Sequence, residues 1–75
     1  MTMARREVES EIAGRVWKIE AQPGDRVAID QPLIILESMK MEIPISAPIA
    51  GTVAEVYVTE KDVVEEGQIV AVLDI

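Results

Sequence analysis

One residue of this chain, Lys40, lies in a setting that suggests chemistry: the segment Glu37-Ser38-Met39-Lys40-Met41-Glu42. A free lysine amine is almost entirely protonated near neutral pH, so it is a poor nucleophile until another group removes its proton. We therefore predict that Lys40 is a substrate for modification. A separate enzyme would bind it, remove the proton and offer an activated acyl group.

The residue types beside Lys40 are unusual for a turn, because turns favour Gly, Asn, Asp and Pro. Exposed Met39 and Met41 would form an apolar surface for a partner to read, whereas buried methionines would only fill the core. We interpret Met39 and Met41, together with Ser38, as recognition residues. Glu37 and Glu42 either steer the segment towards its modifying enzyme or belong to a solvated face.

Composition excludes several other functions. The chain has no His and no Cys, so neither a Ser-His-Asp arrangement nor a Cys/His metal site can form. It also has no P-loop and no dinucleotide motif, and we expect a domain without catalytic activity of its own. A net charge of −7 disfavours binding to nucleic acid. The longest apolar run, Pro32–Leu36, is too short for a membrane span, and no secretory signal is visible, so a cytoplasmic location is expected.

The elements that must position Lys40 come from an internal repeat. Shifting the 75-residue chain by 37 positions aligns its halves without gaps. The aligned identities and close matches are Ile12-Ala13-Gly14 with Ile49-Ala50-Gly51, Val16 with Val53, Asp25 with Asp62, Val27 with Val64, Gln31 with Gln68, Leu36 with Leu73, and Glu37 with Asp74. Residues 38–41 join the two halves. Symmetry therefore predicts a tight hairpin there, at the pole opposite the chain ends, with Lys40 at its tip.

Within each half the apolar residues follow the period of strands. Trp17, Ile19 and Ala21 alternate with polar residues, and we expect Trp17 to be a core or half-buried structural residue without a function of its own. No window has a helical period, so we predict an all-β fold. Two four-strand units would pack face to face as a flattened barrel or sandwich of two four-stranded sheets with quasi-two-fold symmetry. Residues 1–8 are expected to be a flexible tail and residues 9–75 the domain.

Met39-Lys40-Met41 at the junction of two half-repeats resembles the biotin-attachment motif of biotinyl domains, the carriers of acetyl-CoA, propionyl-CoA, methylcrotonyl-CoA and pyruvate carboxylases. The likeness covers about Ser10–Ile75 and includes Pro23-Gly24-Asp25 before the motif and Ala47-Pro48 after it. Position 38 is more commonly Ala than Ser. Because Asp25–Leu36 is as long as Asp62–Leu73, the thumb insertion of some bacterial carriers is absent. The chain looks like a free-standing biotin/lipoyl attachment protein.

This resemblance implies a barrel-sandwich hybrid fold and covalent biotin on Lys40, joined by an amide that biotin protein ligase makes from biotinyl-AMP. Met39, Met41, Ser38, Glu37 and Glu42 would then be the recognition residues. The implied partners are that ligase and the biotin carboxylase and carboxyltransferase of a biotin-dependent carboxylase, between which a monomeric carrier moves a carboxyl group. Tethering would raise the effective concentration of the cofactor to about the millimolar range.

Two alternatives remain open at this stage. A lipoyl domain has the same fold and carries lipoate on its hairpin lysine, but it typically places Asp before and Ala after that lysine, where this chain has Met39 and Met41. The second is an unmodified β-sandwich interaction module, similar to the paired hairpins of membrane-fusion adaptors. Those adaptors insert a helical hairpin where Lys40 lies.

Overall fold

The computed structural model describes residues 4–75, which form eight β-strands and no helix. Accordingly, none of these residues belongs to a helix of the length and apolarity needed to cross a membrane. The strands are β1 (Arg5–Glu9), β2 (Gly14–Ile19), β3 (Arg26–Val27), β4 (Pro32–Ser38), β5 (Met41–Ser46), β6 (Gly51–Val56), β7 (Val63–Val64) and β8 (Ile69–Asp74).

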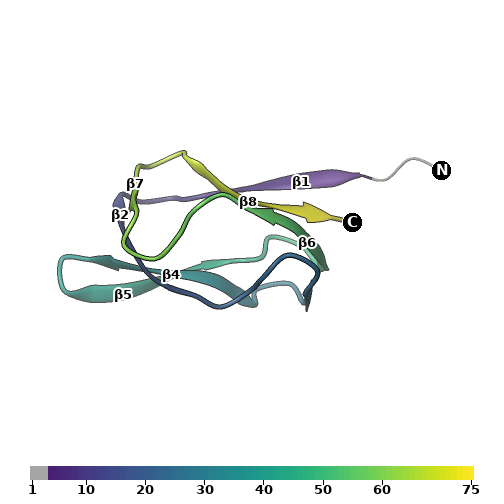
Figure 1. Cartoon of the computed structure of the whole chain (residues 1–75), viewed down its shortest axis with the longest axis horizontal. Helices are drawn as coiled ribbons and strands as arrows, with labels where there is room; N and C mark the ends of the chain where they lie inside the picture. The colour runs from purple at the N-terminus through teal and green to yellow at the C-terminus, as the bar shows by residue number, and fades with distance from the viewer. Residues whose placement is uncertain (1–3) are drawn as a thin grey trace.

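The strands form two four-stranded antiparallel sheets, in the orders β1-β8-β6-β3 and β5-β4-β2-β7. The sheets pack face to face around one apolar core (Figure 1). The long apolar runs of β4 and β8 pair with strands on both sides and supply much of the buried surface, as their continuous hydrophobicity predicted. The largest fully buried apolar side chains are Leu33, Ile34, Leu36, Leu73, Val16, Val53, Val64 and Val70. The all-β flattened barrel-sandwich is confirmed.

The 37-residue repeat is visible in the strands: β2, β3 and β4 correspond to β6, β7 and β8, and β1 corresponds to β5. We call the residue 37 positions away the repeat counterpart. Each sheet takes two strands from each half, so the halves are interleaved and neither forms a sheet of its own. The sequence predicted two four-strand units that pack face to face, and the structure adds that the two sheets exchange strands. Interleaving lets the apolar faces of both halves close over a single core.

The turns explain why particular polar residues recur in both halves. The Asp25 carboxylate accepts a hydrogen bond from the Gln22 N–H at 2.9 Å, and its repeat counterpart Asp62 accepts one from the Thr59 N–H at 2.8 Å. Gln31 and Gln68 do the same for the N–H groups of Ala28 and Glu65, both at 3.0 Å. These side chains satisfy turn donors that the strands leave unpaired. The repeated Asp and Gln therefore shape the fold.

The N-terminal segment differs from the expected tail of residues 1–8. Arg5–Glu9 form β1, which pairs with β8, and the side chain of Val8 is only 3% exposed. Four of the five β1 residues are charged, which hid the strand from sequence reasoning. Backbone pairing along β8 and one inward valine hold it instead. The part of the expected tail at residues 1–3 lies outside the described residues.

Of the two places expected for Trp17, the structure shows the half-buried one and not the core, because its side chain is 49% exposed. The pairing of β2 with β4 shifts register between Val16 and Lys18, so Trp17 is the extra residue of a β-bulge. A bulge breaks the two-residue alternation on which the prediction depended. The repeat counterpart of this bulge lies at Ala54 in β6, where the pairing with β8 shifts between Val53 and Glu55.

Candidate functional site

The junction of the two halves is a hairpin between β4 and β5 that closes through the two-residue turn Met39-Lys40. In Figure 1 this hairpin extends from one end of the molecule, and the start of β1 and the C-terminus lie at the other. Ser38 and Met41 are the last paired residues before the turn. The predicted position of Lys40 at a hairpin tip opposite the termini is therefore confirmed.

The turn side chains point into solvent. Met39 is 92% exposed and Met41 63% exposed, so neither methionine fills the core. Lys40 is exposed as well, and Ser38 is half-buried. Among the described residues the ion pairs are Arg5–Asp74 and Lys18–Glu20, and Lys40 takes part in neither. The Lys40 amine is thus free to enter another protein.

The backbone of the turn is in an unfavourable conformation for its side chains. Met39 has φ 52° and Lys40 has φ 64°, both in the left-handed region. Two successive residues with positive φ are typical of the type I′ turn of a two-residue β-hairpin loop, in which Asn-Gly is the preferred sequence. For an ordinary L-residue the left-handed conformation costs about 1–2 kcal/mol. Met39 and Lys40 therefore occupy backbone positions that carry a conformational cost for their side chains.

The hairpin stem carries two like charges face to face. Glu37 in β4 lies directly opposite Glu42 in β5, and both side chains are exposed. The repeat counterparts of these residues are Asp74 and Arg5, which form an ion pair with 3.1 Å between Arg5 Nε and Asp74 Oδ1. Opposite charges thus stabilise the pole of the chain ends, whereas like charges oppose each other beside Lys40.

A glycine fixes how closely the hairpin stem approaches β2. A Cβ atom on Gly14 would lie 3.0 Å from the Glu37 carbonyl oxygen and 3.4 Å from Leu36 Cβ. A side chain at residue 14 would therefore crowd the strand that leads to the turn and push it a few tenths of an ångström from β2. The contact is tighter at its repeat counterpart Gly51, where an added Cβ atom would lie 2.6 Å from the Asp74 carbonyl oxygen.

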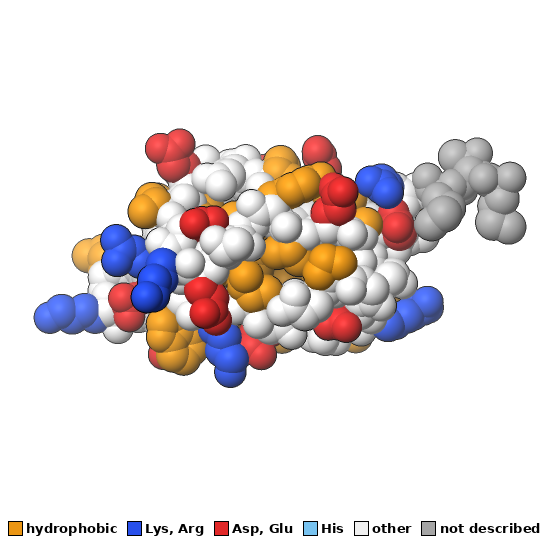
Figure 2. Space-filling model, in the orientation of Figure 1, with side chains coloured by type: hydrophobic (Ala, Val, Ile, Leu, Met, Phe, Trp, Pro, Cys, Tyr) orange, Lys and Arg blue, Asp and Glu red, His pale blue; other side chains and the backbone are white. Residues whose placement is uncertain are grey.

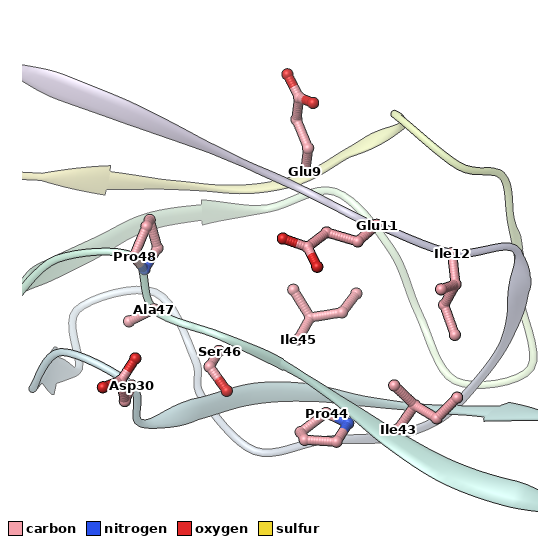
Figure 3. A pocket seen from close by; sticks show the side chains of 10 residues that line it. All are labelled: Glu9, Glu11, Ile12, Asp30, Ile43, Pro44, Ile45, Ser46, Ala47 and Pro48. Atoms are coloured by element: carbon pink, nitrogen blue, oxygen red, sulfur yellow. The ribbon is translucent and has the colours of Figure 1, made fainter.

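A groove of about 340 Å³ lies between the edge strands β1 and β5, away from the turn (Figure 3). Ile12, Ile43 and Ile45 form part of its lining, and the carboxylate of Glu11 extends over it while that of Glu9 points away. Within the part of the chain that is described, no three His, Cys, Asp or Glu residues are placed to hold a metal ion.

Two features of this site were not found from the sequence. The left-handed turn is one, because neither Met39 nor Lys40 belongs to the residue types that announce it. The contrast between Glu37–Glu42 and Arg5–Asp74 is the other. Extending the 37-residue alignment to residue 5 would have revealed that contrast, but the low similarity of β1 and β5 concealed the correspondence.

Comparisons with known proteins give a consistent result. Residues 4–73 match the Biotin_lipoyl family, described as "Biotin-requiring enzyme". The chain is 47% identical over 62 residues to a biotin/lipoyl attachment protein of Bacillus subtilis, a match that covers 83% of this chain and 85% of that protein. It is 40% identical over 67 residues to the biotinylated protein TB7.3 homolog of Mycobacterium leprae, with 89% and 94% covered.

Among solved structures, the Kluyveromyces lactis urea carboxylase superposes with a TM-score of 0.89 at 36% sequence identity. That match covers 97% of this chain but 6% of the carboxylase chain. A single-chain long-chain acyl-CoA carboxylase gives a TM-score of 0.87 at 30% identity, with 93% and 7% covered. Similar domains thus occur both as small proteins and as small parts of large carboxylases.

Proposed function

This chain belongs to the Biotin_lipoyl family, and on that premise we propose that it is a biotin carboxyl carrier domain acylated with biotin on Lys40. The observation that carries the proposal is the Met39-Lys40 turn, where two exposed side chains occupy left-handed positions better suited to Asn and Gly. A turn selected only for stability would not keep these residues. Their retention is explained if another protein must read the methionine and reach the amine.

The residues present fit the proposed cofactor. Lys40 is exposed and has no ion-pair partner among the described residues, so an activated carboxyl group can approach its amine. After a ligase removes its proton, Lys40 Nζ would attack the acyl carbon of biotinyl-AMP, forming an amide as AMP leaves. Biotin, once attached, supplies the atom that carries the carboxyl group. The chain's own contribution is to bind, expose and tether.

The proposed partners are a biotin protein ligase, and the biotin carboxylase and carboxyltransferase of a biotin-dependent carboxylase. The names of the relatives support the carboxylase partners, since they include a biotin carboxyl carrier protein of Streptococcus mutans and pyruvate carboxylase of Mus musculus. Met39 and Met41 are proposed as the apolar contacts that these partners read, because both are exposed beside the amine. Ser38, Glu37 and Glu42 are proposed to border that contact.

The intact mass of the protein tests this proposal after co-expression with a biotin protein ligase and excess biotin. Condensation on Lys40 should add about 226 Da. Lys40→Arg keeps the charge and should show no added mass, while its circular dichroism spectrum and thermal midpoint stay unchanged. An unmodified wild-type protein, or biotin located on another lysine, would refute the assignment.

Lipoylation of Lys40 is the second candidate. One relative, 38% identical over 60 residues, is named the dihydrolipoyllysine-residue acetyltransferase component of the pyruvate dehydrogenase complex of Mycoplasma genitalium. Co-expression with a lipoate ligase would add about 188 Da if that candidate were correct. The residues on both sides of Lys40 are methionines, and we propose that they favour biotin.

A further inference from the structure

Because the fold is duplicated, each surface residue near the hairpin can be compared with its repeat counterpart at the other pole. Both poles of the molecule are built by equivalent strands, so a difference between repeat counterparts is a difference that the fold does not require. Three exposed apolar residues of the sheet that contains the hairpin, β5-β4-β2-β7, have small or charged counterparts. These pairs are Trp17 with Ala54, Val63 with Arg26, and Met41 with Ala4.

Trp17 is the most informative of the three. The same β-bulge occurs at Trp17 in β2 and at Ala54 in β6, so alanine is sufficient to form it. The Trp17 side chain is 49% exposed and borders a hollow of about 250 Å³ whose other lining residues are Arg15, Val16, Glu37, Glu60 and Lys61. The fold alone therefore does not account for an indole at this position.

Val63 adjoins the same surface. It pairs across the strands with Arg15, which in turn pairs with Glu37 of the hairpin stem. Val63 is an apolar side chain that is 67% exposed, and its repeat counterpart is the charged residue Arg26. Trp17 and Val63 thus flank Arg15, in a patch that is contiguous with the hairpin.

This patch lies close enough to Lys40 to share one interface with it. Lys40 follows Glu37 by three positions, which corresponds to about 10 Å along a strand. A standard interface uses about 20 residues on each side, far more than a two-residue turn and its neighbours can supply. An enzyme that holds Lys40 in its active centre must therefore contact further residues of the domain.

We propose that Trp17 and Val63 form a second contact surface for the enzyme that acylates Lys40, an inference that rests on the proposed function. Tryptophan in a partly enclosed hollow is a frequent anchor of protein interfaces. Basic side chains gather at the hairpin end of this otherwise acidic chain (Figure 2), and Arg15 and Lys61 border the indole. Glu37 and Glu60 line the same hollow, so its charges balance, and the matching surface of the ligase should be an apolar depression that receives the indole.

The first test is the steady-state kinetics of biotin transfer by a biotin protein ligase, with the unmodified domain as the varied substrate. Trp17→Ala and Val63→Arg each install the residue of the repeat counterpart. We expect Trp17→Ala to raise KM about tenfold and leave kcat unchanged, since tenfold corresponds to about 1.4 kcal/mol of binding. Trp17→Phe keeps an aromatic ring and should restore KM to within about threefold of the wild-type value, given the same conversion.

A matched control is Tyr57→Ala, which removes the other exposed aromatic residue. Tyr57 is 55% exposed and lies beside β1 of the other sheet, so its loss should leave KM unchanged. The second test separates contact from chemistry. The Lys40→Arg variant should inhibit biotinylation of the wild-type domain competitively, and adding Trp17→Ala should raise its inhibition constant by the same factor as KM. Thermal unfolding of each variant verifies that the fold persists.

Unchanged KM and inhibition constants in the Trp17→Ala variants would overturn the second contact surface. An equal effect of Tyr57→Ala would also overturn it, because the loss would not be local. Neither result would touch the proposed function, which depends only on the added mass at Lys40. Conversely, a wild-type domain that takes up no biotin would overturn the proposed function itself.

Discussion

Replacing both residues of the hairpin turn, Met39→Asn together with Lys40→Gly, should make the domain more stable and impossible to modify at this site. The structure gives φ 52° and 64° for these residues, and each ordinary residue in that region costs about 1–2 kcal/mol. Glycine avoids this cost and asparagine reduces it, but glycine also increases the entropy of the unfolded chain by about 0.4–1 kcal/mol. The net gain for the double variant should be about 1–2 kcal/mol.

Urea and thermal unfolding followed by circular dichroism measure this gain, and a domain of this size should gain about 4–8 °C in Tm for each kcal/mol. The internal control is Asp30→Gly. Asp30 has φ 69°, its repeat counterpart Gly67 has φ 84°, and the position lies away from the hairpin. This control should raise Tm by a smaller amount, since Asp tolerates the left-handed region, and should leave biotin transfer unchanged. A double variant no more stable than wild type would refute the conformational argument for the site.

Three further predictions concern the hairpin stem and the opposite pole. Glu42→Arg recreates the opposite-charge pairing of the other pole and should stabilise the domain by about 0.5 kcal/mol at low salt, a gain measured by urea unfolding that about 0.5 M salt should reduce. Gly51→Ala should destabilise more than Gly14→Ala in thermal unfolding, because the added Cβ would meet a backbone oxygen at 2.6 Å rather than 3.0 Å. The hydrogen bond that the Tyr57 hydroxyl donates to Glu55 raises the pKa of the phenol above 10.0, so its absorbance titration should shift to lower pH in Glu55→Gln.

Each of these predictions has a control or a contrary outcome. Glu66→Arg makes the same change in net charge away from the hairpin, and an equal gain there would show that Glu42→Arg acts through net charge alone. Equal losses in the two glycine variants would contradict the contact argument. For Tyr57 the pKa of the phenol is higher in the folded state than in the unfolded state. The stabilisation that comes from this pKa difference is therefore complete below pH 10.0 and is lost as the pH rises through the raised pKa. A stability that increases over that range would contradict the assignment.

Much of the fold could be predicted because the repeat constrains it at many positions at once. Apolar runs such as Leu33–Leu36 occur twice, with the same turn residues at the same spacing, and these place strands and turns together. The junction of the repeat also placed Lys40 at a hairpin tip. What the sequence could not supply was the pairing between the halves, since interleaved and separate sheets bury the same residues. The strand β1 was missed because backbone pairing, not side-chain pattern, holds it in place.

Trp17 illustrates a limit of periodicity that concerns function directly. Alternation assigns every second residue to one face, but a single bulge shifts the residue that follows it and exposes a side chain that the pattern counts as buried. The β1 and β5 segments illustrate a second limit, because their sequences are too dissimilar to be recognised as counterparts. The pair Arg5–Asp74 was therefore not matched to the pair Glu42–Glu37 from the sequence. Both features became visible only when residue counterparts could be compared on the folded chain.

A duplicated domain allows stability and function to be separated within one molecule. Three unfavourable features lie in the sheet that contains the hairpin or in its turn. They are the left-handed Met39-Lys40 turn, the Glu37–Glu42 pair and the exposed Trp17. At the equivalent positions described at the other pole, an ion pair and a small side chain occur instead. Because equivalent strands form both poles, the fold does not itself require the Glu37–Glu42 pair or an indole at position 17. They are most simply explained by selection for contact with other proteins, and substituting the counterpart residues one at a time would measure how much stability each contact costs.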